Sequence, residues 1–435
     1  MGKNNFRKIA TITLFESAVQ WYCFLLYGTA AGTVFHKVFF SQTGNGTTAL
    51  ILSYMSFAIG YIAGPFGAIF FGHIGDRKGR KVTMYASLLM MGISTSIIGI
   101  LPPAASAGVG VVIVLQLMRL AQCFGRGGTW GGGILMAYEN VPENKRSFYA
   151  AIPQIGLPIG FGLSSILIAV PTLLLPEDIF FTWGWRIPFL AAIILTLIVI
   201  RQKGEMMETE DYKKAQAKLE AEEAEGKKHK VGFIPMVKGY WKTLLLGCGT
   251  RWVDGTFYNI FIVWILSYCI NWLGMPLIQT YIITIIACIF KIPFTLFGGW
   301  CAQKLGNTRT FVIGALASAV LSIPTLKVIE LSKGNLAITI IGIVLGWSIA
   351  YNLIWAVISS LWSSYFETEV RYSGISFVYH VPSFLVAGMV PTICTLLINY
   401  GNGDTIYVGI YSTVVALISA ACALALKARH DRGEK

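Results

Sequence analysis

The stretch GHIGDRKGRKVTM, residues 72–84, concentrates charge in a chain that is otherwise apolar. Five charged side chains fall within its first ten positions, although Asp, Glu, Lys and Arg make up only 13% of the sequence. Long apolar runs flank it on both sides, at 47–71 and 82–102. A helix that crosses a bilayer needs about 20 mostly apolar residues, so both runs are long enough to span. The charged stretch is therefore expected to connect two membrane-spanning segments.

The rest of the chain repeats this pattern. Of its 435 residues, 55% are hydrophobic, and the mean hydropathy is +0.65. That is more apolar surface than one soluble core buries. The sequence predicts an all-α integral membrane protein with twelve transmembrane helices in two sets of six. The apolar runs lie at about 9–35, 47–71, 82–102, 109–137, 148–174, 184–200, 243–271, 277–303, 309–328, 335–364, 371–398 and 403–426.

A segment rich in Glu, Lys and Ala separates the two sets of runs. The predicted division is a six-helix bundle over 1–200, a charged cytoplasmic linker over 201–242 and a second bundle over 243–435. The charges of the linker are spaced so that it either forms a solvated helix or stays partly disordered. A regulatory docking role for this segment is the alternative.

The distribution of Lys and Arg orients the chain, because these residues accumulate on the cytoplasmic side of a membrane. With the N-terminus inside, the inner segments hold 26 of the 34 Lys and Arg residues. We therefore expect a multi-pass protein of the cytoplasmic membrane with both termini cytoplasmic. The net charge of +13 then reflects membrane topology, and nucleic-acid binding is not expected. The eight cysteines lie singly without a CxxC pair, so neither a metal site nor a cofactor is expected.

The two halves of the chain resemble each other in sequence. FGHIGDRKGRKVTM aligns with GGWCAQKLGNTRTF at an offset of 227 residues, and PENKRSFYA aligns with ETEVRYSGI at an offset of 225. The second alignment places Arg146 on Arg371. Two matches at nearly the same offset indicate parallel six-helix repeats. A substrate site between the halves, near the middle of the membrane, follows from such an arrangement.

Several pieces of the sequence are similar to one known family. GHIGDRKGRK resembles the signature of the major facilitator superfamily, and the flanking pieces resemble its metabolite:proton symporter branch, which includes carriers of 2-oxoglutarate, shikimate, citrate, and proline or betaine. The pieces are QWYCFLLYGTAAGTVFHKVFF, MRLAQCFGRGGTWGGG, YENVPENKRSFYAAIPQIGLPIG, WGWRIPFL and YFETEVRYSGISFVYH. The resemblance spans most of the chain and implies a major facilitator fold.

The resemblance also implies a role for the charged loop. In the family, the Asp and Arg residues of this loop tie the two halves together on the cytoplasmic side. The expected cytoplasmic gate therefore consists of Asp76, Arg77, Arg80, Arg146 and Arg371. A simple positive-inside anchor is the alternative, but it accounts only for the lysines of the loop. The second copy of the loop has Gln303 at the position that aligns with Asp76. A charged contact between the halves is therefore weaker at this second copy.

Ionisable residues inside the spans are the main functional candidates, because such groups are costly in a bilayer. The predicted substrate-binding residues are Arg119, Arg126, Arg251 and Lys291, and the predicted proton-coupling residues are Glu16, Asp254 and His380. Two simpler interpretations stay open. Arg251 and Asp254 stand three apart and can neutralise each other, and His380 can be a packing histidine.

The chain departs from the family at acidic positions. Where the branch reads EWYDF and GGEWGG, this chain has Gln20, Cys23 and Thr129. Proton coupling through the usual residues is therefore not expected. Glu16 lies four residues before Gln20 on the same helical face. It therefore offers a carboxylate one helical turn from the acidic position that Gln20 replaces. An ion pair between Glu16 and Arg126 is the alternative role for this carboxylate.

These observations predict a secondary transporter of a small organic anion, most plausibly a carboxylate, with protons as the candidate coupling ion. The excess of cations over carboxylates inside the spans favours an anion, and Arg suits bidentate carboxylate recognition. The alternatives are an uncoupled facilitator, a carrier of a zwitterion such as betaine or proline, and a membrane sensor that has the fold without transport. An enzyme is not expected. The expected partners are a small-molecule substrate and the lipid bilayer, and the chain is expected to be a monomer.

Overall fold

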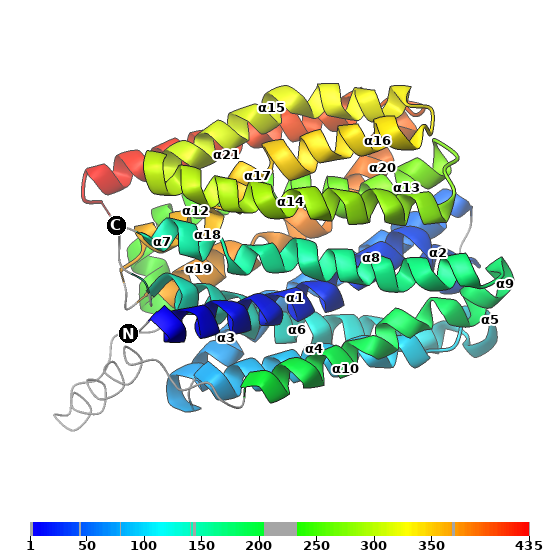
Figure 1. Cartoon of the computed structure of the whole chain (residues 1–435), viewed down its shortest axis with the longest axis horizontal. Helices are drawn as coiled ribbons and strands as arrows, with labels where there is room; N and C mark the ends of the chain where they lie inside the picture. Colours follow the sequence, from blue (N-terminus) through cyan, green and yellow to red (C-terminus); the bar gives the residue numbers. More distant parts are fainter. Residues whose placement is uncertain are drawn as a thin grey trace.

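The structure is a computed structural model that describes residues 3–42, 45–78, 80–139, 141, 145–203, 233–367 and 370–434. Long helices run side by side along one direction, and both termini lie at the same end of the molecule (Figure 1). Within the described residues, ten helical runs are long and apolar enough to cross a membrane. Helix α1 and the run formed by α19, η6 and α20 complete the twelve predicted transmembrane segments. The all-helical membrane fold is therefore confirmed.

The helices of the first half are α1 (Lys3–Thr33), α2 (Phe35–Val38), α3 (Gly46–Lys78), α4 (Arg80–Ile100), α5 (Ala104–Ala107), α6 (Val109–Glu139), α7 (Arg146–Ala150), η2 (Pro153–Ile155), α8 (Gly156–Leu174), α9 (Glu177–Ile179), η3 (Phe180–Gly184) and α10 (Arg186–Lys203).

The helices of the second half are α12 (Phe233–Asn259), η4 (Ile260–Trp264), α13 (Ile265–Asn271), α14 (Leu277–Leu305), α15 (Asn307–Leu331), α16 (Leu336–Ile343), η5 (Val344–Ala350), α17 (Asn352–Trp355), α18 (Ile358–Tyr365), α19 (Arg371–His380), η6 (Phe384–Gly388), α20 (Val390–Tyr400) and α21 (Ile406–Asp431).

Most contacts between helices fall within one half. In the first half, α6 packs against α3 and α4, and α1 packs against α8; in the second half, α21 packs against α12 and α15. Between the halves, α8 contacts α14, α3 contacts α19 and η6, and α1 contacts η4. The site expected between the halves must therefore be built by α1, α3, α6, α12 and α19.

Helix α12 begins at Phe233, ahead of the apolar run expected at 243–271, and it bends at Tyr240, whose φ of −117° and ψ of 19° are not helical. Lys238 and Lys242 interrupt the apolar residues of this helix start and conceal it from an apolar-run criterion. Residues 204–232 lie outside the described residues, so the linker and the domain division remain predictions.

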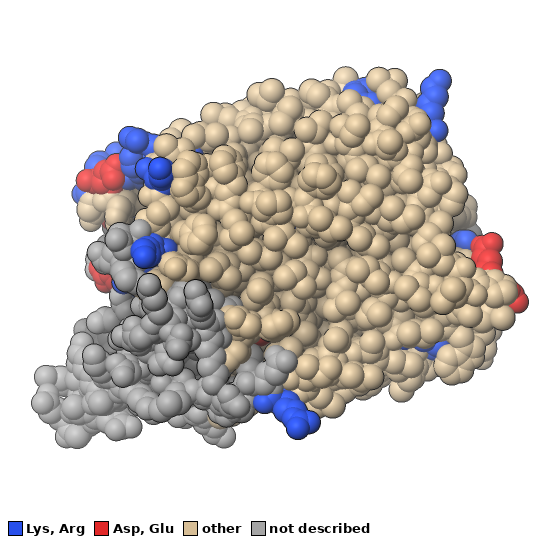
Figure 2. All heavy atoms as spheres, viewed as in Figure 1, with Lys and Arg blue, Asp and Glu red and all other residues tan. Residues whose placement is uncertain are grey.

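The surface has the polarity of a membrane protein. On the face drawn in Figure 2, charged side chains gather at the two ends, and the broad band between them is almost entirely uncharged. Large apolar side chains of the helices are exposed, among them Phe66, Val320 and Leu385, which are 63%, 72% and 67% exposed. Lipid tails are a suitable environment for such a band, because there is no cost in exposing apolar atoms to them.

Glycines in α6 allow α3 and α6 to approach at backbone distance. A Cβ atom added at Gly127 would lie 2.4 Å from the backbone nitrogen of Ala68, and one added at Gly67 would lie 1.9 Å from the backbone oxygen of Phe124. Small residues at such crossings are typical of packed membrane helices. The glycine-rich run of α6 is thus a packing surface and not a phosphate-binding loop.

This close approach generates a test on stability. Gly127→Ala should destabilise the protein by about 1–3 kcal/mol, because the added methyl group meets backbone atoms that cannot move aside. Gly110→Ala in the same helix is the matched control, since a Cβ there meets nothing within 4 Å. Thermal unfolding of the purified variants should give a lower Tm for Gly127→Ala only. Equal Tm values would contradict the packing role.

Candidate functional site

Arg126 and Tyr379 connect the two halves at the centre of the membrane region. Arg126 lies on α6 and donates a hydrogen bond from Nη2 to the hydroxyl of Tyr379 on α19. The guanidinium carbon of Arg126 also lies 3.9 Å from the ring centre of Phe24 and 4.9 Å from that of Trp21. Arg126 is only 3% exposed. A buried cation in the first half is thus held by aromatic rings and by a hydroxyl of the second half.

A second guanidinium lies against the same tyrosine. Arg251 on α12 places its guanidinium carbon 4.4 Å from the ring centre of Tyr379. Its Nη1 donates to Oδ2 of Asp254, and Oδ1 of Asp254 accepts from the hydroxyl of Tyr351. Arg251 and Asp254 are each 1% exposed. The ion pair that their spacing permits is therefore present, with Tyr351 as its third member.

Lys291 continues this polar chain deeper into the second half. Its Nζ donates to Oδ1 of Asn352 over 2.9 Å, and it lies 4.4 Å from the ring centre of Tyr351. Asn352 in turn donates to the backbone oxygen of Lys291 over 2.8 Å. Lys291 is fully buried. Arg251, Asp254, Tyr351, Lys291 and Asn352 thus form one connected polar network in the C-terminal half.

Arg119 lies in different surroundings from Arg126, although the two share a helical face. Its guanidinium carbon lies 4.5 Å from the ring centres of both Phe24 and Tyr27 and 4.6 Å from that of Phe57. It also donates to Oε1 of Gln122. All of these partners belong to the first half. Arg119 therefore stabilises the interior of one bundle, whereas Arg126 faces the other.

Several buried hydrogen-bond donors around Arg126 and Arg251 make no hydrogen bond to a described residue. They are Trp21 Nε1, Tyr61 hydroxyl, Arg126 Nε, Arg251 Nε, Tyr258 hydroxyl and His380 Nε2. Ring contacts connect this set: the Trp21 and Tyr258 rings lie 5.7 Å apart, and Tyr379 and His380 5.0 Å apart. Buried polar groups are nearly always hydrogen-bonded, so a cluster of this kind requires an explanation. The donors come from α1, α3, α6, α12 and α19, the helices at the junction of the halves.

The predicted coupling residues Glu16, Asp254 and His380 are all buried. Glu16 on α1 is 2% exposed, and His380 on α19 is 3% exposed. A Cβ atom added at Gly64 on α3 would lie 2.9 Å from Nδ1 of His380, so His380 reaches the opposite half. Of the positions that depart from the family pattern, Thr129 donates to the backbone oxygen of Arg126 over 3.1 Å. That hydroxyl therefore does not replace the missing carboxylate.

Hydrogen bonds join the halves on both sides of the centre. Toward the termini, Gln154 Nε2 donates to the backbone oxygen of Trp355 over 3.2 Å, and Trp355 Nε1 donates to the backbone oxygen of Gln154 over 3.0 Å. Toward the opposite end, the Tyr54 hydroxyl donates to the Ser267 hydroxyl over 2.7 Å. Protein contacts therefore hold the halves together on both sides of the centre.

The predicted cytoplasmic gate is described only in part. The side chains of Asp76, Arg77 and Arg80 lie outside the described residues. Arg146 begins α7, and Arg371 begins α19 and donates from Nε to the backbone oxygen of Phe366 over 3.2 Å. The cytoplasmic gate therefore remains a prediction.

The sequence did not single out the neutral members of the site. Tyr379, Tyr351 and Asn352 connect the charged residues, and Gln154 and Trp355 close the centre. Charge in an apolar span reveals an ionisable residue, but tyrosine and asparagine are common in such spans. One signal was available, because Tyr379 directly precedes His380 in FVYH.

The fold and the site place the protein in a known class. The model of the Major Facilitator Superfamily matches residues 17–391. The chain belongs to this superfamily of membrane transporters, and it is a multi-pass membrane protein. The matched relatives are transporters and not enzymes.

Two relatives from Escherichia coli are similar over nearly their whole length. The inner membrane metabolite transport protein YhjE is 33% identical over 98% of this chain and 96% of its own. The shikimate transporter is 31% identical over 97% of this chain and 94% of its own. Among solved structures, the xylose transporter XylE from E. coli superposes with a TM-score of 0.72 at 15% identity, over 96% of each chain. That similarity concerns the fold alone.

The buried ion pair generates a test of its structural role. Arg251→Gln should destabilise the protein by about 3–5 kcal/mol, because the variant leaves the carboxylate of Asp254 buried without its cation. The double variant Arg251→Gln/Asp254→Asn removes both charges and should recover most of the lost stability. Thermal unfolding of the two variants measures the difference. If the double variant is no more stable than the single one, the charges of Arg251 and Asp254 do not compensate each other.

Proposed function

We propose that the protein transports a small organic anion, namely a carboxylate, by alternating access between its two halves. The observation that carries the proposal is the cluster of buried donors around Arg126 and Arg251. These groups are guanidinium, indole and phenol groups, which mainly offer protons. A ligand that satisfies them must be rich in acceptors. A carboxylate has two oxygens that accept several hydrogen bonds and matches the planar fork of arginine.

The charge balance of the spans supports the same ligand class. Among the described residues, the buried charges within the spans are Arg119, Arg126, Arg186, Arg251 and Lys291 against Glu16 and Asp254. Arg186 lies near one end of its span and donates to the backbone oxygens of Gly99 and Leu101. Unbalanced positive charge is costly at membrane depth. An anion that enters the centre reduces this imbalance, whereas a zwitterion or a neutral sugar does not.

We assign different roles to the four cations of the site. Arg126 is the best placed to contact substrate, because it lies between the halves and its Nε has no described hydrogen-bond partner. Arg251 lies against the ring of Tyr379 and supplies the second positive group. Arg119 and Lys291 have aromatic and amide partners within their own halves and act through the electrostatic potential. A carboxylate bound to Arg126 takes the place of the Tyr379 hydroxyl.

Alternating access then requires the two closures to break in turn. Breaking the Tyr54–Ser267 bond opens the centre toward the end opposite the termini. Breaking the two Gln154–Trp355 bonds opens it toward the termini. Rocking of the halves around a fixed central site is the general mechanism for repeat-built transporters. In this proposal the termini and the gate residues Asp76, Arg77, Arg80, Arg146 and Arg371 face the cytoplasm.

Protons are the proposed coupling ion, with Glu16 as their carrier. A buried carboxylate changes its proton affinity when a nearby charge arrives or leaves. Glu16 lies one helical turn from Gln20, where the family pattern has a carboxylate, and Asp254 is already paired with Arg251. His380 is the second candidate. The proline/betaine transporters among the relatives leave a zwitterion carrier as the alternative function, and uncoupled facilitation and sensing without transport are the others.

The sign of the substrate can be tested by removing the guanidinium that lies between the halves. Arg126→Gln should weaken carboxylate binding by about 1.5–3 kcal/mol, since the lost hydrogen bond is charge-assisted, which is roughly one to two decades in affinity. Tyr379→Phe should retain carboxylate binding, because the removed hydroxyl competes with the ligand for Arg126. Ligand-induced shifts in Tm, measured for a panel of carboxylates and for betaine, give both comparisons.

The matched control is Arg432→Gln, which also removes a cation but at a residue whose side chain is 62% exposed. Its carboxylate affinity should equal that of the wild type. The proposal fails if Arg126→Gln binds carboxylates as well as the control does. It also fails if the wild type binds only neutral or zwitterionic compounds.

Coupling is tested by a separate variant. Glu16→Gln should abolish uphill accumulation of substrate under an imposed pH gradient, because the variant cannot take up a proton. Counterflow exchange of substrate needs no net proton movement and should continue. Uptake into proteoliposomes measures both, and intact pH-driven accumulation would exclude Glu16 as the required carrier.

A further inference from the structure

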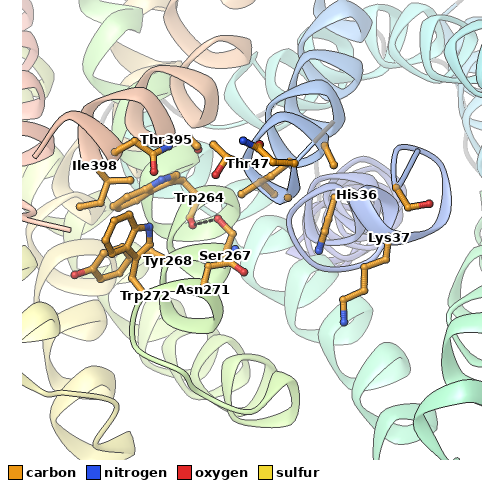
Figure 3. Close-up of a pocket in the computed structure, with 16 residues that line it drawn as sticks. His36, Lys37, Thr47, Trp264, Ser267, Tyr268, Asn271, Trp272, Thr395 and Ile398 are labelled. Carbon is orange, nitrogen blue, oxygen red and sulfur yellow. Dashed lines mark hydrogen bonds between the residues drawn. The ribbon is translucent and has the colours of Figure 1, made fainter. Parts of the chain in front are cut away.

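Two lysines near the end opposite the termini contact carboxylates directly. Lys37, which lines the pocket drawn in Figure 3, lies 3.7 Å from Oε1 of Glu177. Lys327 donates to Oε1 of Glu330 over 2.9 Å and to Oδ1 of Asp404 over 2.7 Å. In each case an anion neutralises the ammonium group at close range. The buried lysine of α14 has different surroundings.

Lys291 on α14 is fully buried, but the partners that its ammonium contacts are neutral. Its Nζ donates to Oδ1 of Asn352 over 2.9 Å and lies 4.7 Å from the ring centre of Trp347. The hydroxyl of Thr295 also donates to Oδ1 of Asn352, over 3.1 Å. None of the carboxylates that the structure describes forms an ion pair with Lys291. Because buried charges are normally paired, this arrangement requires an explanation.

Tyr351 joins Lys291 to Asp254. The ammonium lies 4.4 Å from the ring centre of Tyr351, and the hydroxyl of the same ring donates to Oδ1 of Asp254. The ring of Phe257 lies parallel to that of Tyr351, with the two centres 6.4 Å apart, and helps to fix its orientation. Charges in a protein interior act over longer distances than in water. The ammonium of Lys291 is therefore a second positive charge close to Asp254, after that of Arg251.

Substrate binding changes the balance of charge around Asp254. In the proposed function, an anion at Arg126 also engages Arg251, whose Nε makes no hydrogen bond to a described residue. An anion that competes for Arg251 weakens its contact with Asp254. A buried carboxylate that loses its cation either takes up a proton or depends on another cation. Lys291 can serve as that cation, because no carboxylate neutralises it directly.

We infer that Lys291 is a positioning residue that keeps Asp254 ionised while the substrate engages Arg251. The inference rests on the proposed function and gives the two buried carboxylates different roles. Glu16 carries the proton, whereas Asp254 remains an anion throughout the cycle. Asp254 can then pair with Arg251 again when the substrate leaves, without a proton transfer. Lys291 acts through Tyr351 and does not contact the substrate.

The test imitates the engaged state without a substrate. Arg251→Gln removes the first cation of Asp254, and infrared spectroscopy of the purified protein distinguishes a protonated carboxyl group from a carboxylate. At pH 7, Asp254 should be ionised in Arg251→Gln, because Lys291 is still present. In Arg251→Gln/Lys291→Met, the protonated form of Asp254 should increase about tenfold or more, since no cation remains nearby. Adding Asp254→Asn should remove the new band and so identifies it.

Two control variants separate charge from packing. Arg251→Gln/Lys291→Arg retains a cation at this position, and its spectrum should match that of Arg251→Gln. Lys291→Met alone should also show an ionised Asp254, because Arg251 still contacts it. In Arg251→Gln/Lys291→Met, the protonated band should decrease as the pH is raised from 6 to 9. A purely structural role for Lys291 would not produce a signal that follows charge in this way.

The possible results lead to clear decisions. A protonated Asp254 in Arg251→Gln, or an ionised one in Arg251→Gln/Lys291→Met, would overturn the inference. If the double variant does not fold, adding Asp254→Asn should restore folding. A triple variant that still does not fold would give Lys291 a structural role and contradict the inference. Failure of the wild type to bind carboxylates would count against the proposed function, and it would leave these spectra unchanged.

Discussion

The cost of placing charge inside a membrane governs the arrangement of this protein. An ionised group at bilayer depth loses its hydration, and only partners in the protein can replace it. The buried cations of the site have such partners, and the kind of partner differs from one cation to the next. Arg119 has aromatic rings, Arg251 has the carboxylate of Asp254, and Lys291 has the amide of Asn352. Only Arg126 depends on a residue of the opposite half.

This difference explains why the centre can change while the bundles remain intact. Partners that belong to the same half move together with their charge, so rocking of the halves leaves their free energy unchanged. The contact between Arg126 and Tyr379 crosses the junction and must be rebuilt whenever the halves separate. In the proposed function, the substrate anion replaces this contact, and compensation of charge is then coupled to movement of the halves at Arg126.

The sequence was sufficient for the fold because apolar runs and the placement of basic residues depend on the bilayer alone. It also predicted the contact between Arg251 and Asp254, since three residues along a helix bring two side chains to the same face. It could not separate Arg119 from Arg126, because helical spacing says nothing about which neighbouring helix each one faces. The neutral residues Tyr379 and Asn352 were out of reach for a related reason, because their partners Arg126 and Lys291 lie on other helices.

The reciprocal bonds between Gln154 and Trp355 have a consequence for how the path toward the termini opens. Each residue is both donor and acceptor to the other, with bonds of 3.2 Å and 3.0 Å. A small separation of the two helices stretches both bonds at once and leaves two donors and two acceptors unsatisfied. Intermediate separations are therefore unfavourable compared with full contact or with full solvation of the amide and the indole. Opening on this side is expected to be a switch between two discrete states, and its rate, unlike a gradual widening, should depend steeply on temperature.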